Sequence, residues 1–187
     1  MQKFIFQETS IENLKLITPF YAPDSRGYLT KTFEKSIFSA HGIDIQPWEE
    51  LRSFSKKGVL RGLHFQRRNS QDKLVQVLHG AVYDAAVDLR KDSPTFGKWE
   101  GFYLTAENRQ MLYIPKNFAH GFLALEDGTL LNYLCGDLCD SGSEDGIIWN
   151  DPELNIPWPL SSEQTPILSQ RDQGFQTFAQ FKNSGGY

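Results

Sequence analysis

The stretch KLVQVLHGAVYDAAVDLR, from Lys73 to Arg90, is the part of the sequence that indicates the fold most directly. Apolar residues precede the His79–Gly80 pair and return after it, in Val82, Ala85 and Val87. Glycine adopts the backbone conformations of tight turns at little cost, so the pattern predicts two strands on either side of a turn.

The same kind of pattern recurs further along the chain. Apolar and polar residues alternate in Trp99–Leu104 and again in Met111–Ile114, which is the period of a strand with one buried face. Ala106–Arg109 supplies turn residues between them, so we expect these two strands to form a hairpin.

Phe122–Leu125 and Leu130–Leu134 are expected to form a further strand pair around a turn near Gly128. Helices are few in the prediction. One is expected at Lys35–His41, ending at a glycine, and a second at Gln170–Phe181.

The chain has the size and composition of one globular domain. It has 187 residues, of which 40% are hydrophobic and 13% aromatic, so we expect a single domain over residues 1–187 with a frayed tail at 183–187. Many short strands and little helix predict an all-β fold, a jelly roll barrel with short peripheral helices. The mouth of such a barrel is a natural site for a small molecule.

Charge and hydropathy exclude several classes of protein. The formal net charge is −4, without the excess of lysine and arginine that is typical of nucleic-acid-binding proteins. No apolar run is long enough to span a membrane, and Met1–Glu8 is too polar for a signal peptide. Two cysteines are too few to staple this domain, so we expect a cytoplasmic protein.

Two of the four histidines lie in apolar surroundings. His64 is in the run LRGLHFQ, where strict alternation would place it on one face with Leu60 and Gly62, opposite Arg61. His120 lies in FAHGF. Polar side chains in such strands are costly to bury unless the strands line a wet cavity, and imidazole suits proton transfer near neutral pH. Two hydrogen-bonded core histidines are the alternative.

Metal and nucleophilic chemistry are not indicated. The sequence has no His-x-His pair of the kind that metal-binding barrels use, so we expect no metal and no other cofactor. Cys135 and Cys139 have no histidine or basic residue beside them in the sequence that would favour a thiolate. No glycine-rich phosphate-binding loop is present.

In combination and order, several motifs resemble those of the dTDP-4-dehydrorhamnose 3,5-epimerase family over about residues 24–172. The motifs are DSRG (24–27), VLRGLHFQ (59–66), KLV (73–75), VYDAAVDLR (82–90), IPKNFAHGF (114–122), WNDP (149–152) and LSQRD (168–172). The resemblance implies a cupin-type jelly roll that works as a homodimer without metal or redox cofactor. It also implies epimerisation at C3 and C5 of a nucleotide-linked 4-keto-6-deoxyhexose, through an enolate at the C4 ketone.

The resemblance further assigns the catalytic roles. His64 would be the base, oriented by Asp172 or, as the second choice, by Asp84, because a carboxylate behind an imidazole fixes its tautomer. Tyr133 would be the acid on the opposite face of the sugar. Lys73 would place positive charge beside the enolate oxygen, where charge develops in the transition state.

Substrate-binding roles follow from the same resemblance. His120 would contact the sugar near O4. Arg26, Arg61, Glu144 and Arg171 would contact the nucleotide, the arginines facing the diphosphate, because the guanidinium matches phosphate oxygens in a bidentate way.

Departures from the family pattern fall on the nucleotide side. Lys31 stands at a binding position where the family usually has Glu, and Leu29 and Leu138 stand where aromatic residues are usual. An epimerase of one carbon only, an epimerase of a sugar on GDP, CDP or UDP, and a binding cupin without catalysis therefore stay open as alternatives. The sequence does not tell which glycan or secondary-metabolite pathway is served.

Overall fold

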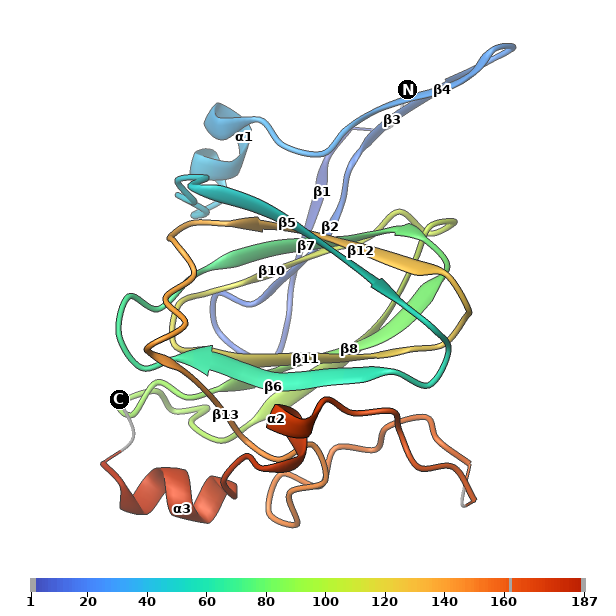
Figure 1. Ribbon diagram of the computed structural model, residues 1–187. Coiled ribbons are helices and arrows are strands. Elements are labelled where there is room, and N and C mark those ends of the chain that lie inside the picture. The colour runs from blue at the N-terminus through green and yellow to red at the C-terminus, as the bar shows by residue number, and fades with distance from the viewer. Residues whose placement is uncertain (1–2, 162, 186–187) are drawn as a thin grey trace.

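The computed structural model describes residues 3–161 and 163–185, which form two packed antiparallel sheets and a projecting hairpin (Figure 1). The strands of the first sheet lie in the order β1 (Ile5–Glu8), β2 (Lys15–Thr18), β10 (Met111–Ile114), β7 (Lys73–His79), β12 (Thr129–Cys135) and β5 (Glu49–Ser55). The strands of the second lie in the order β13 (Glu144–Gly146), β6 (Leu60–Gln66), β11 (Phe118–Ala124), β8 (Ala81–Asp88) and β9 (Trp99–Thr105). The hairpin is β3 (Phe20–Asp24) with β4 (Gly27–Lys31).

The strands are found where the sequence predicts them, including the two on either side of Gly80. The predicted hairpin of Trp99–Leu104 with Met111–Ile114 and the predicted pair of Phe122–Leu125 with Leu130–Leu134 are wrong. β7 and β8, β9 and β10, and β11 and β12 are consecutive, yet the two members of each pair lie in opposite sheets. Their turns carry the chain across the barrel instead of back along the same sheet. This is the topology of a jelly roll, in which the ladders join strands that are distant in the sequence, and it confirms the predicted fold class.

Apolar side chains fill both faces of the second sheet, and β8 is buried along its whole length. One cluster lies between the two sheets and includes Val75, Leu112 and Phe122. Another lies on the outer face of the second sheet, where the C-terminal segment covers Leu63 and Phe65 (Figure 1). Burying a side chain of this size contributes about 1.5–3 kcal/mol, so the C-terminal segment is part of the core.

The helices are short and peripheral. α1 (Lys35–Ala40) matches its prediction, whereas the helix expected at Gln170–Phe181 is two helices, α2 (Gln170–Gln173) and α3 (Phe178–Asn183). The break occurs because Gly174 caps the C-terminus of α2 and Thr177 begins α3 with a capping box. Asn183 therefore ends a helix, while residues 186–187 of the expected tail lie outside the described residues.

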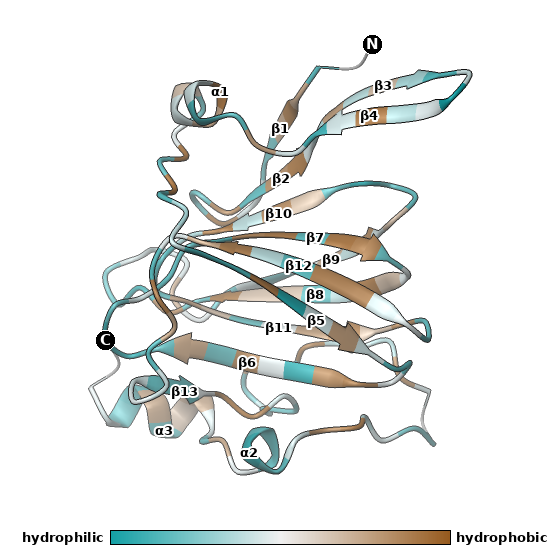
Figure 2. Cartoon of the chain, turned by 45° about the horizontal axis from the view of Figure 1, so that its top comes forward, coloured by the Kyte–Doolittle hydropathy of each residue, from teal (hydrophilic) through white to brown (hydrophobic). Residues whose placement is uncertain are grey.

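Hydropathy follows the layers (Figure 2). Brown, apolar positions recur along the strands of the barrel, whereas the β3–β4 hairpin extends away from both sheets and is teal at its tip. No helix within residues 3–161 and 163–185 is long and apolar enough to cross a membrane.

Candidate active site

A bulge in β6 brings two charged or titratable side chains to one wall of the barrel. In the ladder between β11 and β6, His120 pairs with His64 and Phe122 pairs with Arg61, so three residue steps on β6 match two on β11. The extra residue of a bulge exchanges the faces to which the side chains beyond it point. Arg61 and His64 consequently line the same cavity, and the prediction that they lie on opposite faces is wrong.

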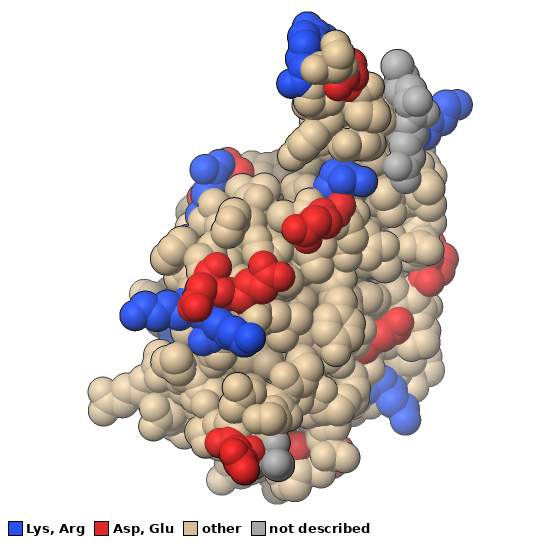
Figure 3. All heavy atoms as spheres, turned by 90° about the vertical axis from the view of Figure 1, so that its right-hand side faces the viewer, with Lys and Arg blue, Asp and Glu red and all other residues tan. Residues whose placement is uncertain are grey.

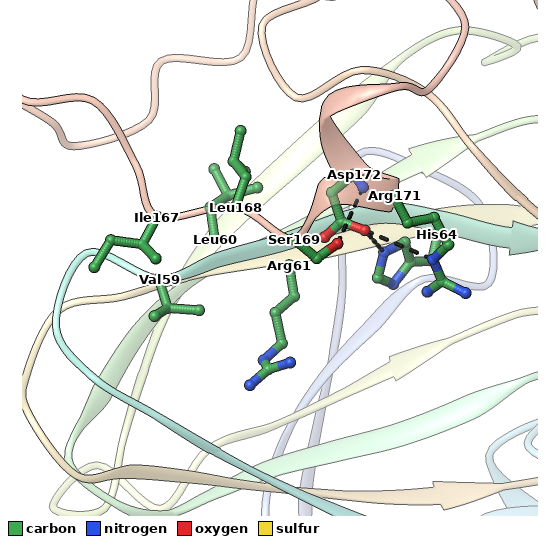
Figure 4. Close-up of a pocket in the computed structure, with 9 residues that line it drawn as sticks. All are labelled: Val59, Leu60, Arg61, His64, Ile167, Leu168, Ser169, Arg171 and Asp172. Carbon is green, nitrogen blue, oxygen red and sulfur yellow. Dashed lines mark hydrogen bonds and ion pairs between the residues drawn. The ribbon is translucent and has the colours of Figure 1, made fainter.

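The His64 imidazole is held by a buried carboxylate. Its Nε2 lies 3.0 Å from Oδ1 of Asp172, which α2 carries over β6 (Figure 4). Burial raises the pKa of Asp172, but hydrogen bonds from His64, Ser169 and the Gly62 backbone outweigh it and lower that pKa below its ordinary value. An ionised carboxylate in this position fixes the imidazole and stabilises the imidazolium that forms when the ring takes a proton.

A second histidine and carboxylate pair lies beside the first. His120 Nε2 lies 3.0 and 2.9 Å from the two carboxylate oxygens of Asp84, and both side chains are buried. Because His64 and His120 are cross-strand neighbours, their rings lie on the same wall. Asp84 therefore partners His120, while Asp172 partners His64, and the sequence could not distinguish these two arrangements.

The cavity between the sheets has a volume of about 150 Å³ and collects most of the predicted site residues. It is lined by Leu51, Arg61, His64, Gln71, Lys73, His120, Phe122, Tyr133, Cys135, Cys139 and Glu144. A groove of about 490 Å³ shares Arg61 and His64 with it and runs past Arg171 and Asp172 (Figure 4). A small chamber with several polar side chains, opening beside a longer groove, is suited to a reacting ring with an extended substituent.

Lys73 begins β7 and carries an ammonium group into the cavity. Among the described residues, no hydrogen bond or ion pair satisfies this group. Burial lowers the pKa of Lys73, while the nearby Cys135, Glu144, Cys139 and Asp84 act in the opposite direction. Burial also raises the pKa of the Cys135 thiol to about 11, so that this neighbour stays neutral. An unpaired cation in such a place favours any negative charge that develops on a bound ligand.

Tyr133 faces the cavity from β12, in the other sheet from His64. Its phenol lies 3.3 Å from the Ser53 hydroxyl, and its ring meets the His120 ring edge-on with centroids 6.2 Å apart. Burial raises the pKa of Tyr133 well above its ordinary value, which keeps the phenol protonated. An imidazole and a phenol thus approach the cavity from opposite sheets.

Polar residues at the rim are already paired with one another. Arg171 donates a hydrogen bond to Glu144, and Arg61 donates to the Ser55 hydroxyl and to the Phe54 carbonyl, each at 3.2 Å. These contacts hold the guanidinium groups along the groove, where an anionic ligand could be bound.

Arg26 and Lys31 are not brought to this cavity. Both lie on the β3–β4 hairpin, where Arg26 pairs with Asp24 and Lys31 pairs with Glu34. Figure 3 shows this hairpin as a projection with blue and red atoms at its end. Within one chain, the two cations therefore lie far from the histidine wall.

Several residues that line the cavity are not among the predicted site residues, namely Leu51, Gln71, Phe122, Cys135 and Cys139. The two-residue period of β12 could have found Cys135, since it shares a face with Tyr133 and Leu131. Gln71 and Cys139 come from connecting segments, for which no periodic signal exists. Among residues 3–161 and 163–185, no group of three or more His, Cys, Asp or Glu side chains could hold a metal ion.

Comparison with known proteins gives a consistent result. The sequence model of the family described as dTDP-4-dehydrorhamnose 3,5-epimerase matches residues 8–180. The dTDP-4-dehydrorhamnose 3,5-epimerase of Methanothermobacter thermautotrophicus is 44% identical over 176 residues, covering 94% of this chain and 95% of that protein.

Solved structures agree with the sequence relatives. A dTDP-6-deoxy-D-glucose-3,5-epimerase from Legionella pneumophila, crystallised with dTDP-4-keto-L-rhamnose, has 40% identity and a TM-score of 0.89, covering 94% of this chain and 93% of its own. A 3'-monoepimerase from Streptomyces bikiniensis, in complex with dTDP-quinovose, has 33% identity and a TM-score of 0.87, covering 95% and 89%.

Proposed function

Because the chain belongs to the dTDP-4-dehydrorhamnose 3,5-epimerase family, we propose how its own residues carry out the reaction of that family. The protein is an isomerase with a cupin-type jelly roll, and its default substrate is dTDP-4-dehydro-6-deoxyglucose, converted to dTDP-4-dehydrorhamnose. C3 and C5 of this sugar both flank the C4 ketone. Removal of either proton therefore gives an enolate whose charge is shared with one oxygen.

His64 is the base in this proposal, and Tyr133 is the acid. The observation that carries it is that the two side chains reach one cavity from opposite sheets. His64 takes the proton from one face of the sugar, the C–H electrons pass into the enolate, and the Tyr133 phenol returns a proton to the other face. A positioned acid or base contributes about 10²–10⁴-fold in rate.

Lys73 and His120 stabilise the enolate oxygen. The Lys73 ammonium has no protein partner among the described residues, so its charge is available to the oxygen at C4. His120 is held against Asp84 through Nε2, and its other ring nitrogen donates to the enolate oxygen when the ring is doubly protonated. Groups that are already in place when the charge develops need no rearrangement in the transition state.

The groove beside the cavity binds the nucleotide diphosphate. Arg61 and Arg171 lie along it, with Glu144 bonded to Arg171. The remaining two cations of the expected set, Arg26 and Lys31, are proposed to act in the site of a second copy of the chain.

A homodimer is supported by the hairpin that carries these two residues. β3 and β4 make a sheet of their own, with Tyr28 62% and Leu29 67% exposed. Exposed apolar residues on a projecting, two-stranded element are typical of a surface that a partner covers. Crossing to the partner would bring Arg26 near the partner's groove.

A cytoplasmic location is also proposed. Cys135 and Cys139 are both free thiols, the state in which reducing compartments keep cysteines.

A one-carbon epimerase is the second candidate. The 3'-monoepimerase from Streptomyces bikiniensis has the same fold over most of its length, so neither the fold nor overall similarity distinguishes the two outcomes.

A nucleotide other than dTDP is a further alternative for the carrier of the sugar. Leu138 is 55% exposed and Leu51 is 44% exposed, and Leu51 lines the cavity. These apolar side chains stand on the side of the site where the nucleotide is expected to bind.

The test is deuterium uptake from the solvent. The protein is incubated in deuterated water with dTDP-4-dehydro-6-deoxyglucose, and deuterium is located in the product. Label at C3 and C5 with inverted configuration is the expected result, and label at one carbon only identifies a monoepimerase. Absence of uptake with every 4-keto nucleotide sugar contradicts catalysis and leaves a binding cupin.

A further inference from the structure

The phenol of Tyr133 is held by a serine of the neighbouring strand. Tyr133 lies opposite Leu51 in the ladder between β12 and β5, so Ser53, two residues further on, is its diagonal neighbour on the same face. The two hydroxyl oxygens are 3.3 Å apart. Among the described residues, this is the one hydrogen bond that the structure records for the phenol.

The direction of this hydrogen bond follows from the chemistry. Each hydroxyl has one hydrogen to donate and lone pairs to accept. If the phenol donated to Ser53, its hydrogen would be unavailable to the sugar carbon. The productive arrangement is therefore the one in which the serine O–H donates and the phenol oxygen accepts.

The same hydrogen bond becomes stronger after the phenol has given up its proton. A donor to an anionic oxygen makes a shorter and stronger hydrogen bond than a donor to a neutral one. The Arg61 guanidinium also favours the phenolate by its charge, although two of its N–H groups are donated to Ser55 and Phe54. Strand β5 thus contributes to holding both groups that stabilise the phenolate.

An epimerase that inverts two carbons must restore its acid between the two events. After one inversion, His64 holds the abstracted proton and Tyr133 lacks one. The phenolate is unfavourable in this buried position, so a route for the returning proton is needed. Ser53 and Tyr133 are both partly buried, and Ser53 lies on β5, an edge strand of its sheet, so its hydroxyl contacts the phenol and is within reach of water.

We propose that Ser53 is a positioning residue for the epimerisation, which aims the Tyr133 proton at the sugar and returns a proton to the phenolate after each inversion. This proposal rests on the proposed function, in which Tyr133 is the acid. In the return step the Ser53 O–H gives its proton to the phenolate and takes one from water. The hydroxide that forms is neutralised by the proton that His64 releases, so the enzyme ends as it began.

The test compares Ser53→Ala with Ser53→Thr, which keeps the hydroxyl. In deuterated water we measure kcat, KM and the ratio of deuterium in recovered, uninverted substrate to deuterium in inverted product. Ser53→Ala is expected to lower kcat about tenfold with KM unchanged, because it removes about one hydrogen bond's contribution to the transition state. The ratio rises, since His64 still removes the proton, exchanges it with the deuterated solvent, and returns a deuteron to the same face. Ser53→Thr restores both quantities.

Two further variants make the inference decisive. Ser55→Ala removes a hydroxyl from the same strand that bonds Arg61 and not Tyr133. It is expected to raise the deuterium ratio less than Ser53→Ala does, because the charge of Arg61 remains and Arg61 keeps its hydrogen bond to the Phe54 carbonyl. In a Tyr133→Phe background, Ser53→Ala should cause no further change, because the group through which it acts is absent. The inference is overturned if Ser53→Ala has the wild-type deuterium ratio. It is also overturned if Ser53→Ala lowers kcat equally in the wild-type and Tyr133→Phe backgrounds. Lack of deuterium uptake by the wild-type enzyme contradicts the proposed function instead.

Discussion

At the scale of single residues, two charged groups of the site differ in how well the protein satisfies them. The Asp172 carboxylate is bonded to His64 and to the Gly62 backbone, and its pKa is lowered, whereas Lys73 has no hydrogen-bond or ion-pair partner among the described residues. The first arrangement orients His64, the proposed base, and the second leaves a cation available to a bound ligand. Both carry consequences for stability that can be measured.

Lys73→Met is expected to stabilise the protein while impairing it as an enzyme. A buried ammonium without a partner costs about 1 kcal/mol or more, which corresponds to an increase in the unfolding temperature of about 2–4 °C on removal. Since burial lowers the folded-state pKa of Lys73, the cost is full below that pKa, declines as the pH rises from it toward the ordinary value of 10.5, and is absent above 10.5. Turnover should fall at least about 10²-fold.

Thermal unfolding of the wild type and Lys73→Met, followed from neutral to alkaline pH, checks this expectation together with steady-state kinetics. Equal unfolding temperatures at neutral pH would mean that the ammonium is satisfied. Unchanged turnover would mean that its charge does not serve the enolate.

Asp172→Asn is expected to lower kcat at least about 10²-fold, because the amide no longer fixes the imidazole as the carboxylate does. Its effect on stability depends on pH with a defined sign. The folded-state pKa of Asp172 is lowered, so the wild type is more stable than the variant above the ordinary value of 3.8. That difference is lost as the pH falls through the folded-state pKa.

Unfolding by urea at a series of acidic pH values measures this difference directly. Convergence of the two proteins at low pH is the expected result. A constant difference across the series contradicts an ionised Asp172 as the source of the stabilisation.

At the scale of elements, the bulge in β6 decides which side chains enter the barrel. It is centred near Gly62, which has φ +132° and lies against the backbone of β11. A Cβ at this position would lie 2.4 Å from the Cα of Gly121 and 2.9 Å from the His120 carbonyl oxygen. No side chain can be accommodated there unless the two strands separate.

Gly62→Ala is therefore expected to destabilise the fold by about 3 kcal/mol or more and to abolish turnover, since it displaces Arg61 and His64 together. Gly27→Ala is the matched control. Gly27 has φ +133° but no atom within 4 Å of an added Cβ, so this variant should cost only about 1–2 kcal/mol of backbone strain.

Chemical denaturation of the two variants gives both values. Similar losses for Gly62→Ala and Gly27→Ala would mean that backbone conformation, rather than the contact with β11, requires glycine in the bulge.

At the scale of the whole molecule, the position of the β3–β4 hairpin bears on where each active site is completed. If the hairpin serves the partner, Arg26→Ala impairs the site of the partner chain, whereas His64→Asn impairs the site of its own chain. In a mixed dimer, with one variant in each chain, both changes fall in one site and the other site keeps both residues intact. Random mixing should restore about a quarter of wild-type activity from two impaired proteins.

The measurement unfolds and refolds the two variants together and assays the mixture beside each variant alone. Activity no greater than the average of the separate proteins would place Arg26 in the site of its own chain or outside any site. Sedimentation of the mixture confirms that dimers are present in the assay.

The sequence predicts the positions of the strands well, because one buried face imposes a two-residue period on each of them. It fails where geometry depends on a partner strand. Strict alternation placed Arg61 opposite His64. Gly62 is the one signal of the bulge in LRGLHFQ, but a glycine within a strand is found at bulges and at close backbone contacts alike. The two predicted strand pairs fail for a related reason: a turn such as that at Gly128 looks alike in the sequence whether the chain returns along one sheet or crosses to the other.

The site was predicted mainly through motif resemblance, and its individual contacts needed the structure. The choice between Asp172 and Asp84 behind His64 could not be made from spacing, because both carboxylates lie far from it in the sequence. Ser53 escaped the prediction because its role depends on the pairing of β5 with β12.

The crossing of consecutive strands between the sheets also governs how this protein folds. His64 meets a carboxylate 108 positions away, and Tyr133 meets a hydroxyl 80 positions away. Such high contact order implies slow folding, with the entropy of closing long loops lost before native contacts compensate for it. A partly synthesised chain that lacks the residues near Asp172 therefore cannot form the complete site. For the same reason, the return of turnover after dilution from denaturant reports the last step of folding.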